Sequence, residues 1–307
     1  MANSRSGFGA FAEDISVSFK FAFKNIISFF LGMLGVLIVT LVLVVIMLLI
    51  FIATVIILTP GGFYDVIEVF VSIIEAFANW PSPTSLGLVV LFIVPLILPV
   101  FVAIGALYGM AREIIESEGT TAEGVFAWYS RRFFPLAGGG IVIFMTTIVP
   151  LAALYAYAYN TLGGNISGTD EVLLIATVVV WFVISSGLLT MMFPGIIDGL
   201  TVRQAVARSV KMGVKYLDRV FSIWIFFLLL ILGLIAPLIW PYPMYWIFEV
   251  YNLDFYPVLA GLFLLFIVVP AMAIAQSRVY LLLGSEEDEI PVTDEEIDES
   301  QKWGANN

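Results

Sequence analysis

The sequence predicts an all-α integral membrane protein built on a bundle of six transmembrane helices. Of its 307 residues, 61% are hydrophobic and only 12% are charged, whereas ordinary soluble domains are about 45–50% apolar and about 25% charged. A chain of this composition cannot cover a water-exposed surface, so its excess apolar residues must face lipid. The length of the apolar runs and the placement of the basic residues support the same class.

Six apolar runs are long enough to cross a hydrocarbon core of about 30 Å at about 1.5 Å per residue. They cover roughly residues 28–58, 86–111, 137–160, 172–197, 220–241 and 257–280. The first run exceeds the length of a perpendicular helix, so we expect it to tilt, to kink or to begin at the interface. The predicted organisation is therefore an amphipathic arm, a membrane domain and a tail, over residues 1–27, 28–283 and 284–307.

The basic residues predict the orientation. All 13 Lys and Arg fall in the N-terminal arm, in the second-to-third and fourth-to-fifth connections, or at the C-terminal end. The other three connections contain acidic residues and no basic ones. Because Lys and Arg remain on the cytoplasmic side of a membrane, we expect a multi-pass protein of the cell membrane with both termini in the cytoplasm.

A weak internal similarity predicts tandem repeats. Residues 119–127 align with residues 199–207 at an offset of 80, and each segment contains a candidate helix-start box. The boxes pair Thr120 with Glu123 and Thr201 with Gln204, so that each side chain would bond a free backbone N–H. The segment 15–25 takes the same place before the first span. We therefore expect three tandem two-span units, each opened by a cytoplasmic amphipathic helix.

A basic stripe follows the fourth span. Arg208, Lys211, Lys215 and Arg219 recur every three or four residues, which places them on one helix face. Such a helix lies in the interface with its cations at anionic headgroups. With Arg203, these residues are the predicted contacts to membrane lipids or to a protein partner. The alternative is that they serve only to set topology.

Polar groups inside the spans are few. Five hydroxyls lie near mid-span, and they would line the cavity of a transporter or bond between helices as packing contacts. They are Thr146, Thr147, Ser185, Ser186 and Thr190. Prolines interrupt five of the six spans, as they do in many transporters and also in membrane proteins that transport nothing. Near the cytoplasmic span ends, Asp198 is expected to pair with Arg203 or Arg278.

Several classes of function are disfavoured. The chain has no Cys and no His, which removes thiolate nucleophiles, His bases and His metal sites. Nucleotide-binding motifs and mid-membrane acids are missing, and no basic tract suits nucleic acid. We therefore expect a non-enzymatic protein with no catalytic residue, metal or cofactor. Asn165 begins a glycosylation triplet in an outer loop.

The tail concentrates the negative charge. Nine of the 24 acidic residues lie between Glu286 and Glu299, within a net charge of −11. A segment this acidic and poor in core residues is expected to be a disordered cytoplasmic extension. Either it is simply solvated or it recruits a cytoplasmic protein partner.

Three short motifs carry a family resemblance. They are residues 19–25 before the first span, residues 194–198 at the end of the fourth, and residues 205–209 in the helix that follows. With these motifs the membrane region resembles a group of poorly characterised archaeal and bacterial membrane proteins, and also the membrane module that precedes some glycerophosphodiester phosphodiesterase domains. That catalytic domain relies on His, which this chain lacks. The resemblance therefore implies a stand-alone membrane module.

Two functions remain open at this point. The first is a membrane scaffold or lipid-interacting module, which predicts no solute-sized polar cavity at mid-membrane. The alternative is a transporter or permease component for a small solute, which requires such a cavity.

Overall fold

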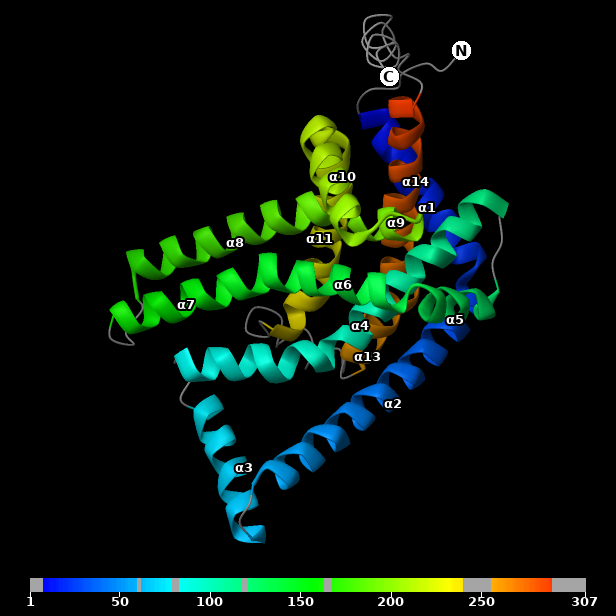
Figure 1. The fold of residues 1–307 in the computed structure, drawn as a ribbon. Coiled ribbons are helices and arrows are strands. Elements are labelled where there is room, and N and C mark those ends of the chain that lie inside the picture. The colour runs from blue at the N-terminus through cyan, green and yellow to red at the C-terminus, as the bar shows by residue number, and fades with distance from the viewer. Residues whose placement is uncertain are drawn as a thin grey trace, which may run out of the picture.

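The computed structural model describes residues 8–59, 62–78, 83–117, 121–162, 167–239 and 255–288. The regular elements in these ranges are all helices (Figure 1). In chain order they are α1 (Phe8–Lys24), α2 (Ile26–Leu58), α3 (Phe63–Ala78), α4 (Pro83–Ser117), α5 (Ala122–Arg131), α6 (Phe133–Ile143), the π-helical turn η1 (Phe144–Ile148), α7 (Val149–Thr161), α8 (Thr169–Leu189), α9 (Met192–Ile197), α10 (Val202–Lys215), α11 (Leu217–Ile239), α13 (Tyr256–Phe263), the π-helical turn η2 (Leu264–Val268) and α14 (Val269–Asp288). The acidic tail beyond Asp288 and the triplet at Asn165 lie outside the described residues.

The predicted fold class is confirmed. Within the described ranges, six helical stretches are long and apolar enough to cross a membrane. They are Ile26–Ile57, Ile97–Ser117, Phe133–Thr161, Thr169–Ile197, Leu217–Pro237 and Tyr256–Ser285. The long first run forms one unbroken helix, α2, and α4 continues past the predicted end of the second span to Ser117.

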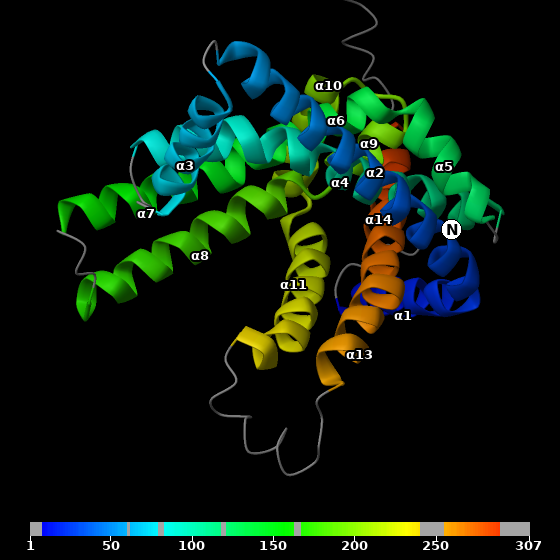
Figure 2. The ribbon, with the colours of Figure 1, turned by 90° about the horizontal axis from the view of Figure 1, so that it is seen from below.

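The spans converge at one end and diverge toward the other (Figures 1 and 2). The paired helices α7 and α8 extend away together, while α11 and α13 form another hairpin and α3 joins α2 to α4. Most of the buried core gathers where the spans converge, around α14, which packs against α1, α4, α9 and α11. We call this the basic end, because the ion pairs of Arg112, Arg219 and Arg278 lie there.

A short amphipathic helix precedes the first, third and fifth spans, and a single residue joins it to the span each time. The joints are Asn25 between α1 and α2, Arg132 between α5 and α6, and Tyr216 between α10 and α11. Their backbone angles are similar, with φ of −108°, −117° and −119° and ψ of 19°, 19° and 45°. Each joint therefore bends the chain in nearly the same way.

The same positions around each joint are buried. Four residues after the joints come Phe29, Leu136 and Val220, and each is fully buried. Seven residues before the joints come Ser18, Val125 and Ser209, which are also buried. Each amphipathic helix therefore buries a residue about two turns before its joint, and each span buries one about a turn after it.

The predicted helix-start box is confirmed before α10 and wrong before α5. Thr201 is the N-cap of α10, and its side chain and that of Gln204 bond each other's backbone N–H. Before α5 the N-cap is Thr121 instead of Thr120, so Glu123 stands one position too early for a capping box. The two N-caps, Thr121 and Thr201, lie 80 residues apart. Because α10 has 14 residues and α5 has 10, α10 is about one turn longer.

Close packing at α4 depends on a glycine. A Cβ atom on Gly109 would lie 2.2 Å from Cγ of Trp128 on α5, well inside van der Waals contact. The indole of Trp128 is also held in place, because its Nε1 donates to Glu113 Oε1 at 2.8 Å. The small residue thus lets α5 lie directly against α4.

Candidate functional site

The helix α10 lies at the basic end and braces the end of the fourth span. Between α8 and α9 the helix is interrupted at Thr190 and Met191. Ser209 of α10 satisfies two backbone groups at this break. Its Oγ donates to the carbonyl of Leu188 at 2.6 Å and accepts from the N–H of Met191 at 3.1 Å. The small residues Ala205 and Gly213 are buried on the same side, so one face of α10 is fixed against the bundle.

The five predicted contact cations separate into two groups. Arg203, Lys211 and Lys215 have exposed side chains. Arg208 turns toward the bundle, where its guanidinium lies over the ring of Tyr280 at 5.0 Å, and Arg219 bonds Asp14 of α1. The exposed group is therefore smaller than the stripe in the sequence suggests.

Apolar side chains lie beside the exposed cations. Val210, Val214 and Leu217 have 36%, 64% and 56% of their surface exposed, although β-branched and leucine side chains favour burial. We define the exposed face of α10 as Arg203, Lys211 and Lys215 together with Val210 and Val214. This face combines cations with unburied apolar groups in the way that interfacial helices do.

A second cluster fixes the N-terminal arm. Asp14 of α1 is 1% exposed, and Arg219 and Arg278 both bond its carboxylate. Nη2 of Arg278 also lies 3.1 Å from Oε1 of Glu13. Two arginines from α11 and α14 thus hold two acids of α1, and charge-assisted bonds of this kind compensate for burying the carboxylate.

Asp198 does not pair with Arg278, one of its two predicted partners; each of these residues has another partner. Asp198, just after α9, forms its ion pair with Arg112 of α4, while Arg278 bonds the arm acids. The hydroxyl of Tyr280 on α14 lies 3.4 Å from Oδ2 of Asp198. Asp198 therefore links the basic ends of the second, fourth and sixth spans.

The same three spans meet slightly deeper in the bundle. The hydroxyl of Tyr108 on α4 donates to Oε1 of Gln276 on α14 at 2.5 Å, and both side chains are buried. Its ring also stacks on Phe193 of α9, with ring centres 5.6 Å apart. These contacts pin the three returning spans to one another in the low-dielectric interior, where an unpaired amide would be costly.

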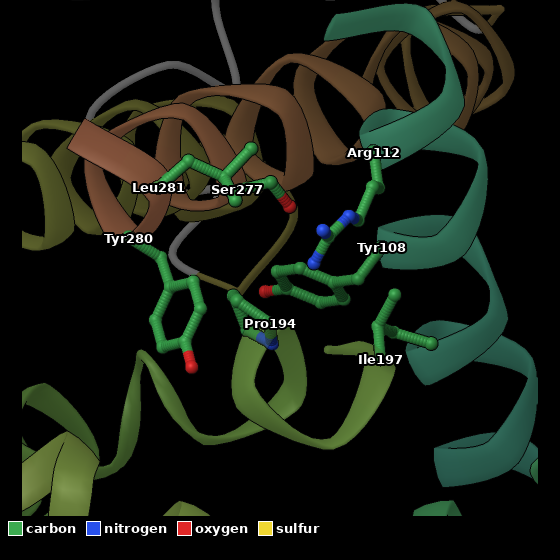
Figure 3. A pocket seen from close by; sticks show the side chains of 7 residues that line it. All are labelled: Tyr108, Arg112, Pro194, Ile197, Ser277, Tyr280 and Leu281. Carbon is green, nitrogen blue, oxygen red and sulfur yellow. The ribbon is translucent and has the colours of Figure 1, made fainter. Parts of the chain in front are cut away.

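A small cavity lies between these spans (Figure 3). Its lining residues are Tyr108, Arg112, Pro194, Ile197, Ser277, Tyr280 and Leu281. Its volume is about 10 Å³, which is room for about one water molecule. Ser277 Oγ, which points toward Arg112 in Figure 3, is buried with no hydrogen-bond partner among the described residues. The cavity is too small for a solute.

The five predicted cavity hydroxyls lie around η1 and α8. Three of them bond carbonyls of their own helix, with Thr146 donating to Val142 and both Ser185 and Ser186 donating to Phe182. Thr190 is 9% exposed at the break after α8. Thr147 is 1% exposed, and its hydroxyl has no partner within the described ranges. The hydroxyls of Thr146, Ser185 and Ser186 are therefore bonded within their own helices, as packing groups are.

The π-helical turn at this level has an identifiable cause. Pro150 follows η1 and has no N–H to donate to the carbonyl of Thr146, four residues earlier. Trp181 of α8 donates to that carbonyl instead, at 3.2 Å. The turn η2 likewise precedes a proline, Pro270. Prolines in these spans therefore distort the helix locally, and a neighbouring side chain can satisfy the released carbonyl.

Sequence reasoning missed several residues of these clusters. Asp14 and Glu13 stand in the arm with nothing nearby to mark their partners, which lie 205 and 265 residues away. One signal was available, because Asp14 and Ser18 fall on the apolar face of α1 in a four-residue spacing. A carboxylate on the buried face of an amphipathic helix indicates a buried cation partner.

Comparisons with protein-family models, with curated proteins and with solved structures each found no match. No family model therefore supports the resemblance to the membrane module of glycerophosphodiester phosphodiesterases. What the structure shows is a six-helix apolar bundle of the kind found in multi-pass membrane proteins.

Proposed function

We propose that this chain is a non-enzymatic membrane scaffold whose basic end binds anionic lipid headgroups. The observation that carries the proposal is the exposed face of α10, where Arg203 and Lys211 stand beside the unburied Val210 and Val214. Cations near a membrane surface gain about 1 kcal/mol each from anionic lipids, and apolar side chains on such a helix enter the headgroup boundary. The opposite face is anchored by Ser209, so the surface is presented rigidly.

The same proposal places the basic end at the cytoplasmic leaflet. It rests on the 13 basic residues, none of which falls in an outer connection of the six-span arrangement. Anionic lipids attract basic segments on that side. In this orientation both termini are cytoplasmic.

Three tandem units would build such a scaffold. Supporting this are the three single-residue joints, Asn25, Arg132 and Tyr216, with similar backbone angles. The matching buried positions Phe29, Leu136 and Val220 add to it. Three amphipathic helices would then surround a shared core of returning spans.

Lipid retention tests the lipid proposal. Detergent-purified protein is titrated with phosphatidylglycerol or phosphatidylcholine, and native mass spectrometry counts the bound lipids. The variant R203Q/K211Q/K215Q should lose phosphatidylglycerol affinity by at least about tenfold, given about 1 kcal/mol per cation. The matched control K20Q/K24Q/R131Q removes three exposed cations from α1 and α5. Equal losses in the two variants would mean that charge alone, and not the α10 face, determines binding.

One observation favours transport as a second candidate. Thr147 is buried in a π-helical turn, and its hydroxyl has no partner within the described ranges. Such turns are frequent at functional sites. Because the chain has no Cys, a Thr147→Cys variant can be probed with a small water-soluble thiol reagent. Rapid labelling would reveal a water path and favour transport, whereas an inert thiol would indicate dry packing.

A further inference from the structure

We propose that the acidic segment 286–299 binds the exposed face of α10 and competes there with anionic lipid. The inference rests on the proposed function, because it names a regulator of the same surface. The acidic segment is a part of this chain outside the described residues, apart from the last turn of α14.

The last turn of α14 lies beside α10. Arg208 of α10 stacks on the ring of Tyr280. Its Nη2 lies 2.8 Å from the position that a Cβ would take on Gly284, one turn further along α14. A larger side chain at Gly284 would therefore displace the guanidinium. Two residues later the acidic run begins with Glu286, so the chain leaves α14 next to the helix that carries the basic face.

The charges of the two segments are complementary. Nine acids fall within the 14 residues from 286 to 299, while Arg203, Lys211 and Lys215 are exposed on α10. Opposite charges interact strongly within a screening length of about 8 Å at physiological salt. A helix of 14 residues is about 21 Å long, and an extended chain covers that length in about seven residues. The acidic segment can therefore reach the whole exposed face.

Competition with lipid follows from the signs of the charges. An anionic headgroup and the acidic segment need the same cations, and they repel each other. At low anionic lipid content the segment occupies the face. At high content the lipids replace it by mass action, and the exposed Val210 and Val214 add an apolar contact with the headgroup boundary.

Zero-length crosslinking tests contact without any lipid. A carbodiimide joins lysine amines to carboxylates in direct contact, and the full-length protein is used in neutral detergent. We expect crosslinks from Lys211 and Lys215 to acids of 286–299, which disappear at 1 M salt. Lys20 and Lys24 of α1 are the internal controls, with exposed side chains on another amphipathic helix. Crosslinks from all four lysines alike, or from none, would overturn the proposal.

A second variant separates this inference from the proposed function. In it the acids of the segment are replaced by amides: E286Q, E287Q, D288N, E289Q, D294N, E295Q, E296Q, D298N and E299Q. Its phosphatidylglycerol affinity should rise about fivefold, and this gain should vanish when R203Q/K211Q/K215Q is added. If wild type and the amide variant bind lipid equally, the segment does not compete and the inference fails while the proposed function stands. If neither responds to the α10 substitutions, the proposed function itself fails.

Discussion

Asp14 of α1 is bonded twice by Arg219 of α11: its Oδ2 accepts from Nε at 3.1 Å and from Nη2 at 2.9 Å. Arg278 of α14 approaches the other oxygen at 3.3 Å. The N-terminal arm is therefore part of the bundle, fixed to the fifth and sixth spans by a buried carboxylate. Its amphipathic character alone would have suggested a helix lying loosely on the membrane.

Replacing Asp14 by Asn should destabilise the protein by about 2 kcal/mol or more, because two arginines lose their shared counter-ion in a buried site. The side chains of Arg219 and Arg278 are 22% and 21% exposed, which keeps the loss below that of a fully buried pair. Glu13→Gln is the matched control, since Glu13 is 45% exposed and should cost less than about 1 kcal/mol. Thermal unfolding in detergent measures the stability of both variants. Equal effects would contradict a buried anchor at Asp14.

Tyr108→Phe removes one hydroxyl and leaves the amide oxygen of Gln276 without its donor. Both groups are buried, so we expect a loss of about 1–3 kcal/mol. Tyr157→Phe is the control because Tyr157 is 70% exposed on α7. Denaturant titration followed by tryptophan fluorescence compares the two. A Tyr108 variant as stable as the control would mean that this contact does not hold the second and sixth spans together.

Gly109→Ala should destabilise the bundle although alanine is the better helix former. The new methyl group would collide with the ring of Trp128, whose Nε1 is fixed to Glu113, and overpacking of this kind costs about 1–3 kcal/mol. Gly233→Ala in α11 meets no atom of the described residues within 4 Å and should be neutral or stabilising. The ratio of folded to aggregated protein after heating gives the comparison. Similar behaviour of the two variants would argue against close packing of α4 and α5.

Single cysteines test the orientation in this cysteine-free chain. Glu68→Cys on α3 and Glu123→Cys on α5 both place the thiol at exposed positions. A membrane-impermeant maleimide added to intact cells should label the cysteine at 68, and should label the cysteine at 123 only after permeabilisation. The reverse pattern would turn the basic end to the outside and remove the basis for binding cytoplasmic-leaflet lipids.

The number of spans could be predicted from the sequence because apolar runs and basic residues are one-dimensional signals. The cap of α10 was equally accessible, since Thr201 and Gln204 stand three residues apart. The pairing of Arg112 with Asp198 was not, because these residues are 86 positions apart and meet only when α4 packs against α9. A charge in a sequence shows neither which span it will face nor how far that span extends.

The basic stripe shows the same limit within one segment. Helical spacing placed Arg208 and Arg219 with Lys211 and Lys215 on one face. The structure turns Arg208 inward to Tyr280, because this residue borders the face of α10 that packs on the bundle. Arg219 lies beyond the joint at Tyr216, on α11, where it bonds Asp14. Periodicity groups residues by direction, while the position of the neighbouring helices decides which edge of the group is buried.

Photo-crosslinking tests the central claim, lipid binding at the exposed face of α10, most directly. The full-length protein is reconstituted in nanodiscs with a phosphatidylglycerol analogue that carries a photoreactive group near its headgroup, and adducts are mapped by mass spectrometry. We predict adducts concentrated on residues 203–217, reduced by R203Q/K211Q/K215Q and absent with a phosphatidylcholine analogue. Adducts spread evenly over α1, α5 and α10, or unchanged by the substitutions, would contradict the account.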